Sequence, residues 1–146
     1  MKKSNPILRT VNVIFFVLFL ISAALQYNDP DPYIWIPIYL YAAVLCFYAF
    51  RSRYFPKAYI AGIIVYAILA VPRFLDNDGV LNWMNEHNSE NLAQSMKASK
   101  PYIENAREFF GLLILIISLL ANLIYYNWVF SKNRSQSKAR VPDSHI

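Results

Sequence analysis

Cysteine is nearly absent from this 146-residue chain, and histidine, glycine and charged residues are scarce. The chain has one cysteine, Cys46, which lies inside an apolar run. A single cysteine excludes an intrachain disulfide and a zinc site built from cysteines. The two histidines, His87 and His145, are far apart in the sequence and lie outside the apolar runs. A haem held between two buried histidines is therefore not expected, and no cofactor is predicted.

Charged residues make up 16% of the chain and hydrophobic residues 57%. A soluble domain of this size is usually about 25% charged and about 45–50% apolar, so the balance favours a membrane protein. With 3 Gly and 8 Pro, the chain is neither a flexible linker nor collagen-like.

Four apolar segments are each close to the length of about 20 residues that a helix needs to cross a bilayer. The clearest is the last, FFGLLILIISLLANLIYYNWVF, and the third is the weakest. These segments predict an all-α integral membrane protein in which four transmembrane helices form one bundle within residues 1–131. We expect the spans at about residues 7–27, 33–50, 57–73 and 104–130, with an outer loop at 74–103 and a basic, disordered tail at 132–146.

Basic and acidic residues fall on opposite sides of this predicted bundle. If the N-terminus is cytoplasmic, the inner side carries ten Lys and Arg residues and one acid, Asp143, whereas the outer side carries four basic and eight acidic residues. Basic residues collect in short cytoplasmic loops, so we expect both termini in the cytoplasm and the protein in the cell membrane. The basic tail is then expected to attract anionic lipids, and nucleic acid is not a predicted partner.

The first span also allows a second interpretation. Lys2 and Lys3, an apolar core and the small residues Ser22 and Ala24 resemble a signal peptide that is cleaved after Ala24. Cleavage would leave three spans. The apolar core is longer than most signal-peptide cores, and the next span follows almost at once, which favours a retained first span.

Each span has one helical face that holds most of its small and polar residues. In lipid, small residues allow helices to approach closely and polar groups need partners away from hydrocarbon, so these faces are predicted to turn inward. They are Asn12, Phe19, Ser22, Ala23 and Gln26 in the first span; Asp31, Trp35, Tyr39, Ala42 and Cys46 in the second; Tyr59, Gly62, Tyr66, Ala70 and Arg73 in the third; and Glu104, Arg107, Glu108, Gly111, Leu115, Ser118 and Asn122 in the fourth.

The charged members of these faces lie at the outer ends of the spans. Together with nearby polar and aromatic residues they predict a polar chamber that opens outward, in which Asp31, Glu104, Arg107 and Glu108 come into contact. The candidate chamber residues are Gln26, Asn28, Asp29, Asp31, Trp35, Tyr39, Tyr66, Arg73, Glu104, Arg107 and Glu108.

The link between the first two spans, NDPDP, also has a purely structural explanation. Asp31 is a good N-cap before a proline at the first helical position, and Asn28 or Asp29 can close a turn onto the backbone. The DNDG segment, residues 76–79, is likewise interpreted as a turn, because it lacks the remaining ligands of a calcium loop.

Two segments resemble a known family. Gln26-x-Asn28-Asp29-Pro30-Asp31, followed by Trp35 and Tyr39, is similar to the hallmark segment of the transmembrane protein 220 family. Glu104-x-x-Arg107-Glu108-x-x-Gly111-Leu112, at the start of the last span, is a second match. The resemblance implies a small multipass helical membrane protein and specifies no reaction.

Three interpretations of the polar residues stay open. The chamber could bind a small ligand, or the carboxylates of Asp29, Asp31, Glu104 and Glu108, as oxygen ligands, could hold a divalent cation. Alternatively, Arg73 and Arg107 pair with them in a closed network that stabilises the bundle for a membrane-protein partner or a homodimer. The third interpretation is a membrane enzyme with Asp29 or Glu108 as the general base, or a dimeric transporter. No catalytic residue is assigned, because no nucleophile or metal accompanies these carboxylates.

Overall fold

The computed structural model describes residues 5–85 and 101–140. In chain order the elements are α1 (Pro6–Leu25), the 3-10 turn η1 (Gln26–Asn28), α2 (Pro32–Phe50), α3 (Pro56–Leu75), α4 (Val80–Asn85) and α5 (Pro101–Ala139). Within these residues, α1 with η1, α2, α3 and α5 are long and apolar enough to cross a membrane. The predicted all-α membrane protein with four spans is confirmed.

Proline marks the start of each of these four helices, at Pro6, Pro32, Pro56 and Pro101. A proline fits the first helical position because its missing N–H has no intrahelical partner there and its fixed φ suits the helix. Asn5 adds a cap to α1, since its side chain accepts a hydrogen bond from the N–H of Ile7 at 3.0 Å.

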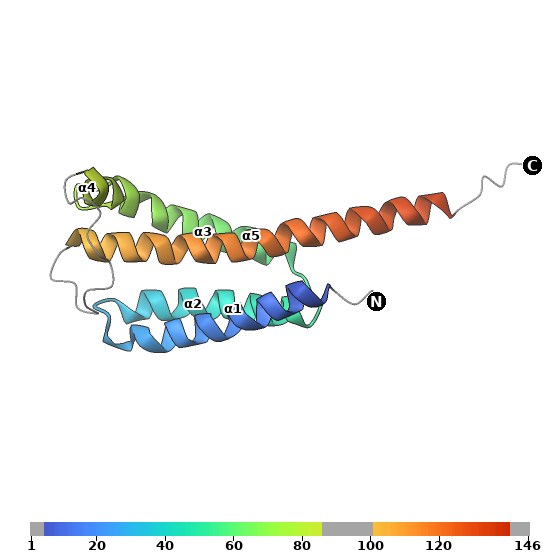
Figure 1. Cartoon of the computed structure of the whole chain (residues 1–146), viewed down its shortest axis with the longest axis horizontal. Coiled ribbons are helices and arrows are strands. Elements are labelled where there is room, and N and C mark those ends of the chain that lie inside the picture. The colour runs from blue at the N-terminus through green and yellow to red at the C-terminus, as the bar shows by residue number, and fades with distance from the viewer. Residues whose placement is uncertain (1–4, 86–100, 141–146) are drawn as a thin grey trace, which may run out of the picture.

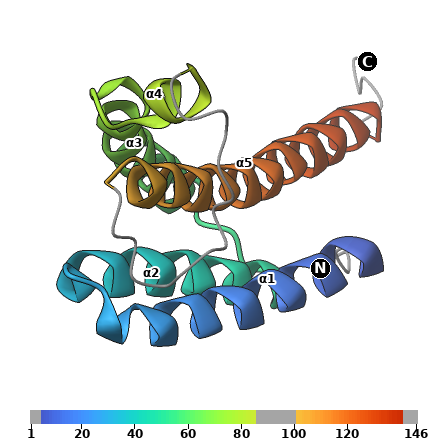
Figure 2. The ribbon, with the colours of Figure 1, turned by 60° about the vertical axis from the view of Figure 1, so that its left-hand side comes forward.

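The helices form two antiparallel pairs that pack against each other (Figures 1 and 2). α1 lies beside α2 and α3 lies beside α5, and the short α4 lies at the end of the bundle where α5 begins. α1 begins at the end of the bundle where α2 and α3 are joined, and α5 runs past that end. The short α1–α2 link and the start of α5 therefore lie together at the opposite end.

The predicted inward faces line the core. The buried residues of α1 are Asn12, Phe19 and Ala23, all from its predicted face. The buried residues of α3 are Tyr59, Gly62, Tyr66 and Ala70, again from the predicted face. Trp35, Ala42 and Cys46 of α2 and Leu115, Ser118 and Asn122 of α5 are buried as well. The helical phases of α1 and α3 are confirmed. In α2 and α5 the buried surface is wider than predicted, since it also includes residues such as Ile38, Leu45, Leu112 and Leu119, whereas Asp31 is exposed.

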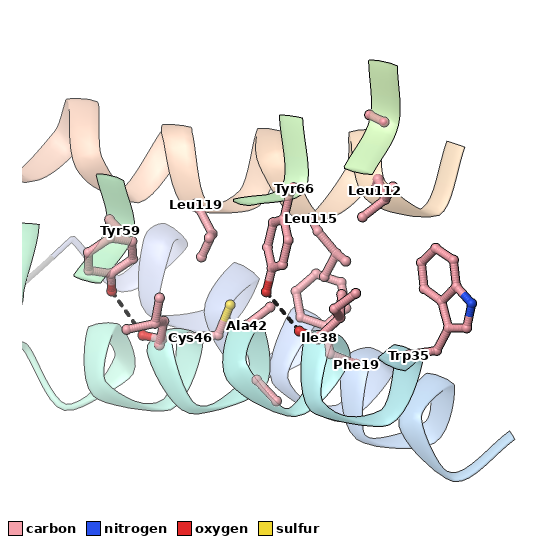
Figure 3. Close-up of a cluster of buried hydrophobic side chains, with 13 residues drawn as sticks. Phe19, Trp35, Ile38, Ala42, Cys46, Tyr59, Tyr66, Leu112, Leu115 and Leu119 are labelled. Carbon is pink, nitrogen blue, oxygen red and sulfur yellow. Dashed lines mark hydrogen bonds between the residues drawn. The ribbon is translucent and has the colours of Figure 1, made fainter. Parts of the chain in front are cut away.

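Tyrosine hydroxyls of α3 fasten it to the backbone of α2 (Figure 3). Tyr66 donates a hydrogen bond to the carbonyl of Ile38 at 2.7 Å, and Tyr59 donates to the carbonyl of Leu45 at 2.9 Å. In the reverse direction, Tyr41 of α2 donates to the carbonyl of Ala58 at 2.7 Å. Buried hydroxyls need such partners, and the two helix pairs are thereby joined by polar bonds within an apolar interface.

Two expectations for the loops can be compared with the structure. The DNDG segment is a turn, as predicted: the N–H of Gly79 donates to the carbonyl of Asp76 at 2.8 Å. The tail is different, because α5 does not end near Phe130 but continues as a helix to Ala139. Residues 131–139 contain the good helix formers Lys, Arg, Gln and Ala and no Pro or Gly, so nothing in them ends the helix.

All acids of the described residues lie at one end of the bundle, and all basic residues except Arg73 and Arg107 lie at the other. We call the end with the α1–α2 link and the start of α5 the acidic end; its acids are Asp29, Asp31, Asp76, Asp78, Glu104 and Glu108. We call the other the basic end; its basic residues are Arg9, Arg51, Arg53, Lys57, Lys132, Arg134, Lys138 and Arg140.

Candidate functional site

An ion pair between α3 and α5 lies at the acidic end. The Nε of Arg73 donates to a carboxylate oxygen of Glu108, and both side chains are mostly shielded from solvent, with exposed fractions of 21% and 16%. The Nη1 of Arg73 donates to the carbonyl of Leu69 at 2.8 Å, on its own helix. The guanidinium carbon also lies 5.0 Å from the ring centroid of Trp35 on α2. Arg73 thus links three helices through an ion pair, a backbone bond and a cation–π contact.

The positions of these charges in their helices favour the pair. Arg73 is in the last turn of α3, where a cation complements the partial negative charge of the helix C-terminus. Glu108 is in the second turn of α5, towards the positive end of that helix, although the dipole effect weakens beyond the first turn. Because α3 and α5 are antiparallel neighbours, the two residues face each other at the same depth.

Tyr39 of α2 packs against the backbone of α5 at Gly111. A Cβ built on Gly111 would lie 2.7 Å from the hydroxyl oxygen of Tyr39, closer than real Cβ contacts. Tyr39 is close enough to both Glu108 and Asp29 to feel the charges of their carboxylates. The glycine of the second family-like motif therefore makes room for the tyrosine of the first.

Asp29 and Asp31 have different surroundings. Asp29 is half-buried, and its charge acts on Glu108, as does the charge of Glu104. Its Oδ1 also accepts a hydrogen bond from the N–H of Asp31 at 3.0 Å, which closes the predicted turn. Asp31 is exposed, and its carboxylate accepts a hydrogen bond from the hydroxyl of Tyr33 at 3.0 Å. It begins α2 as predicted, although its side chain makes no capping bond.

The other predicted chamber residues are distributed as follows. Gln26 and Asn28 lie in η1, where the carbonyl of Gln26 accepts from the N–H of Asp29 at 3.0 Å. Tyr66 lies among the core residues, where its hydroxyl is bound to α2 (Figure 3). Arg107 is half-buried on the first turns of α5. The structure thus gathers Trp35, Tyr39, Arg73 and Glu108, with Asp29 and Glu104 nearby; we call these six residues the polar cluster.

Two hollows lie outside the polar cluster. One of about 410 Å³ is lined by Asp76, Asn77, Leu81, Asn82 and Asn85, around the α3–α4 turn. The other, an apolar groove of about 340 Å³ between α3 and α5, is lined by Ala67, Ala70, Val71, Phe74, Leu75, Phe109, Leu113 and Ile116. In residues 5–85 and 101–140, no group of three or more His, Cys, Asp or Glu side chains is arranged to hold a metal ion.

One pair of residues was not foreseen as a pair. Asn12 of α1 and Asn122 of α5 each lie on a predicted inward face, and the structure joins them by hydrogen bonds. The available signal was that each is an asparagine inside a long apolar run, at a comparable distance from the predicted cytoplasmic surface.

Four apolar helices that bury their small and polar faces and expose Leu, Ile, Val and Phe define a multipass integral membrane protein. The chain belongs to the family described as transmembrane family 220, helix, whose model matches residues 18–124. The matched range includes the NDPD link and the segment from Glu104 to Gly111. No curated protein and no solved structure matches the chain.

Proposed function

We propose that the protein is a non-enzymatic membrane protein that acts by packing against a transmembrane helix of another membrane protein. In this proposal the polar cluster holds α2, α3 and α5 in one fixed arrangement. The observation that carries it is the closed Arg73–Glu108 pair. The guanidinium of Arg73 already binds a carboxylate, a carbonyl and an indole ring of this protein, so it serves to hold the helices together and is not available to a ligand.

The groove between α3 and α5 is the surface that supports partner binding. Its wall contains Ala67 and Ala70, and small residues of this kind let a second helix approach closely in a membrane. Phe74 and Phe109, whose ring centroids are 5.3 Å apart, form its rim from both helices. The rings lie next in sequence to Arg73 and Glu108, so the ion pair also fixes the shape of the groove.

Site-specific photo-crosslinking in native membranes tests this proposal. A crosslinker at Val71 or Leu113, in the groove, should give one discrete adduct, and a crosslinker at Ile14 or Val17, exposed on α1, should give none. Ala67→Leu, which fills part of the groove, should abolish the adduct while leaving the unfolding temperature within a few degrees of the parent. Equal adducts from both helices, or an adduct that survives Ala67→Leu, would contradict the proposal.

A second candidate, a site for a cation or a small ligand at the acidic end, is favoured by one observation. The charges of Asp29 and Glu104 both act on Glu108, so further acidic side chains accompany the Arg73–Glu108 pair at this end. Calcium and magnesium prefer such oxygen ligands. Thermal unfolding of the purified protein with Ca²⁺, Mg²⁺ and small amphiphiles distinguishes the candidates: stabilisation by a cation that is lost in Asp29→Asn supports the cation site.

For orientation, we propose that the basic end faces the cytoplasm and that the protein lies in the cell membrane. Basic residues are retained on the cytoplasmic side of short loops, and the two ends differ strongly in charge. Labelling of single cysteines by an impermeant maleimide in intact cells, in a Cys46→Ala background, tests this. Asn77→Cys at the acidic end should be labelled, and Ser131→Cys should react only after the cells are opened.

A further inference from the structure

We infer that the basic end of the bundle is a binding surface for the phosphate headgroups of anionic phospholipids. The inference concerns the opposite end from the polar cluster, and it depends neither on the proposed partner helix nor on the proposed orientation.

The first support is charge. Eight basic side chains lie at this end, and among the residues that the structure describes no acid accompanies them. Seven of the eight are exposed; Arg9 is half-buried. Three of the exposed residues, Arg51, Arg53 and Lys57, lie in and next to the short α2–α3 link, and the other four follow along α5. Such a group of cations has no acidic side chain beside it among the described residues, and it attracts anions.

The second support is the depth at which the basic end lies in the membrane. Trp128 is 59% exposed, and the Nζ of Lys132 lies 5.2 Å from the centroid of its ring. Tyr54 in the α2–α3 link contacts Tyr126 of α5, with ring centroids 5.4 Å apart. Trp and Tyr collect at the level of the lipid headgroups. Trp128, Tyr54 and Tyr126 therefore place Lys132 and the α2–α3 link at the depth where lipid phosphates are concentrated.

The third support is a pair of buried polar atoms that lack partners. The hydroxyl of Tyr54 and the Nε of Arg9 are both buried without a hydrogen-bond partner at this end of the bundle. Burial raises the pKa of Tyr54, so its hydroxyl stays protonated and can donate. A buried donor without an acceptor is costly, and a phosphate oxygen that reaches either atom through a small local movement would satisfy that atom.

The composition of the exposed end of α5 shows whether this segment lies flat on the membrane or leaves it. From Ser131 to Arg140 every residue is exposed, and Ala139 is the only apolar one. A helix that lies flat in the interface needs an apolar face, which this segment lacks. It therefore leaves the membrane through the headgroup layer, where Lys132 and Arg134 meet phosphate groups from the side.

The test uses the full chain in nanodiscs of phosphatidylcholine alone or mixed with phosphatidylglycerol, with titration of short-chain phosphatidylglycerol in detergent. We expect phosphatidylglycerol to raise the unfolding temperature and to remain bound in native mass spectrometry. The exposed triple variant Arg51→Gln/Arg53→Gln/Lys57→Gln should weaken binding by about fivefold for each residue replaced. Raising the salt to about 1 M, where the screening length falls to about 3 Å, should remove most of the effect.

Two further variants keep the result interpretable. Asp76→Asn/Asp78→Asn raises the net charge at the acidic end, so unchanged lipid binding supports a localised surface, whereas stronger binding would show that net charge alone decides and would overturn the inference. Tyr54→Phe removes an unpartnered hydroxyl, so in phosphatidylcholine it should not lower the unfolding temperature. A smaller stabilisation of Tyr54→Phe by phosphatidylglycerol supports a role for the hydroxyl in headgroup binding. Equal stability of the parent in both lipids, or a shift produced by soluble polyglutamate but not by phosphatidylglycerol, would overturn the inference.

Discussion

Asn12 and Asn122 bind each other reciprocally in the apolar interior between α1 and α5. The Nδ2 of Asn12 donates to the Oδ1 of Asn122 at 2.9 Å, and the Nδ2 of Asn122 donates to the Oδ1 of Asn12 at 2.8 Å. Each amide also donates to a carbonyl one turn earlier in its own helix, on Leu8 and Ser118 respectively. Both amides are therefore satisfied, and the pair fixes α1 against α5 at one register.

This pairing predicts non-additive substitutions. Asn12→Leu or Asn122→Leu alone leaves the other amide without its partner in hydrocarbon, and each should lower the free energy of unfolding by about 1–2 kcal/mol. The double variant removes both polar groups and should be destabilised less than the sum of the two single variants. Unfolding in mixed micelles, analysed as a double-mutant cycle, measures the coupling; additive losses would contradict the pairing.

Gly111→Ala should destabilise the bundle, and a second substitution at Tyr39 should restore most of the lost stability. The new Cβ would lie 2.7 Å from the hydroxyl oxygen of Tyr39, so the tyrosine must move away, at a cost of about 1 kcal/mol. Tyr39→Phe removes the oxygen that clashes, and the double variant should regain most of the lost stability. If Tyr39→Phe makes no difference to Gly111→Ala, the close approach of α2 and α5 at this point is disproved.

Gly79→Ala should be more damaging than Gly111→Ala. A Cβ at Gly79 would lie 2.7–2.9 Å from three backbone carbonyls, those of Arg73, Phe74 and Asp76, and none of these can turn away as a side chain can. We expect the α3–α4 turn to open and Trp83 to lose its contact with Phe110, whose ring centroid is 6.0 Å away. Hydrogen exchange in residues 76–85 should rise, with little change in the middle of α3.

Arg73→Ala should destabilise the bundle by about 2–3 kcal/mol, less than the about 3–5 kcal/mol of a fully buried pair because both side chains keep some exposure. The loss comes mainly from leaving Glu108 unpaired in a shielded position. Arg73→Ala/Glu108→Ala should therefore be more stable than Arg73→Ala, and Glu108→Gln should recover part of the loss in the Arg73→Ala background. Thermal unfolding in one detergent compares the parent, Arg73→Ala and the two double variants. If Arg73→Ala/Glu108→Ala is less stable than Arg73→Ala, the ion pair is contradicted.

Helical periodicity predicted which faces are buried but not which residues meet across the interfaces. The phase of Tyr59, Gly62, Tyr66 and Ala70 was sufficient to place them inward, because a 3.6-residue repeat does not depend on the neighbouring helix. The same repeat contains no information on how far one helix slides along another. It therefore could not show that Tyr66 donates to the carbonyl of Ile38, or that Asn12 meets Asn122.

For the polar cluster too, the sequence predicted which region the residues occupy but not which side chains meet there. Arg73, Glu108, Trp35 and Tyr39 were assigned to one region because their spans end there, and the structure gathers them. The choice between Asp29 and Asp31 depends on the direction of each side chain within a tight turn, which spacing does not determine. The helical continuation of α5 was missed because low apolar content indicates solvent exposure, and a solvated segment can still extend an existing helix.

α5 has a mechanical consequence. Its 39 residues run without interruption from the polar cluster to beyond the basic end, a length of about 58 Å. Because this one helix carries Glu108 near its start and Lys132 near its end, the two ends of the bundle are connected by a single continuous rigid element.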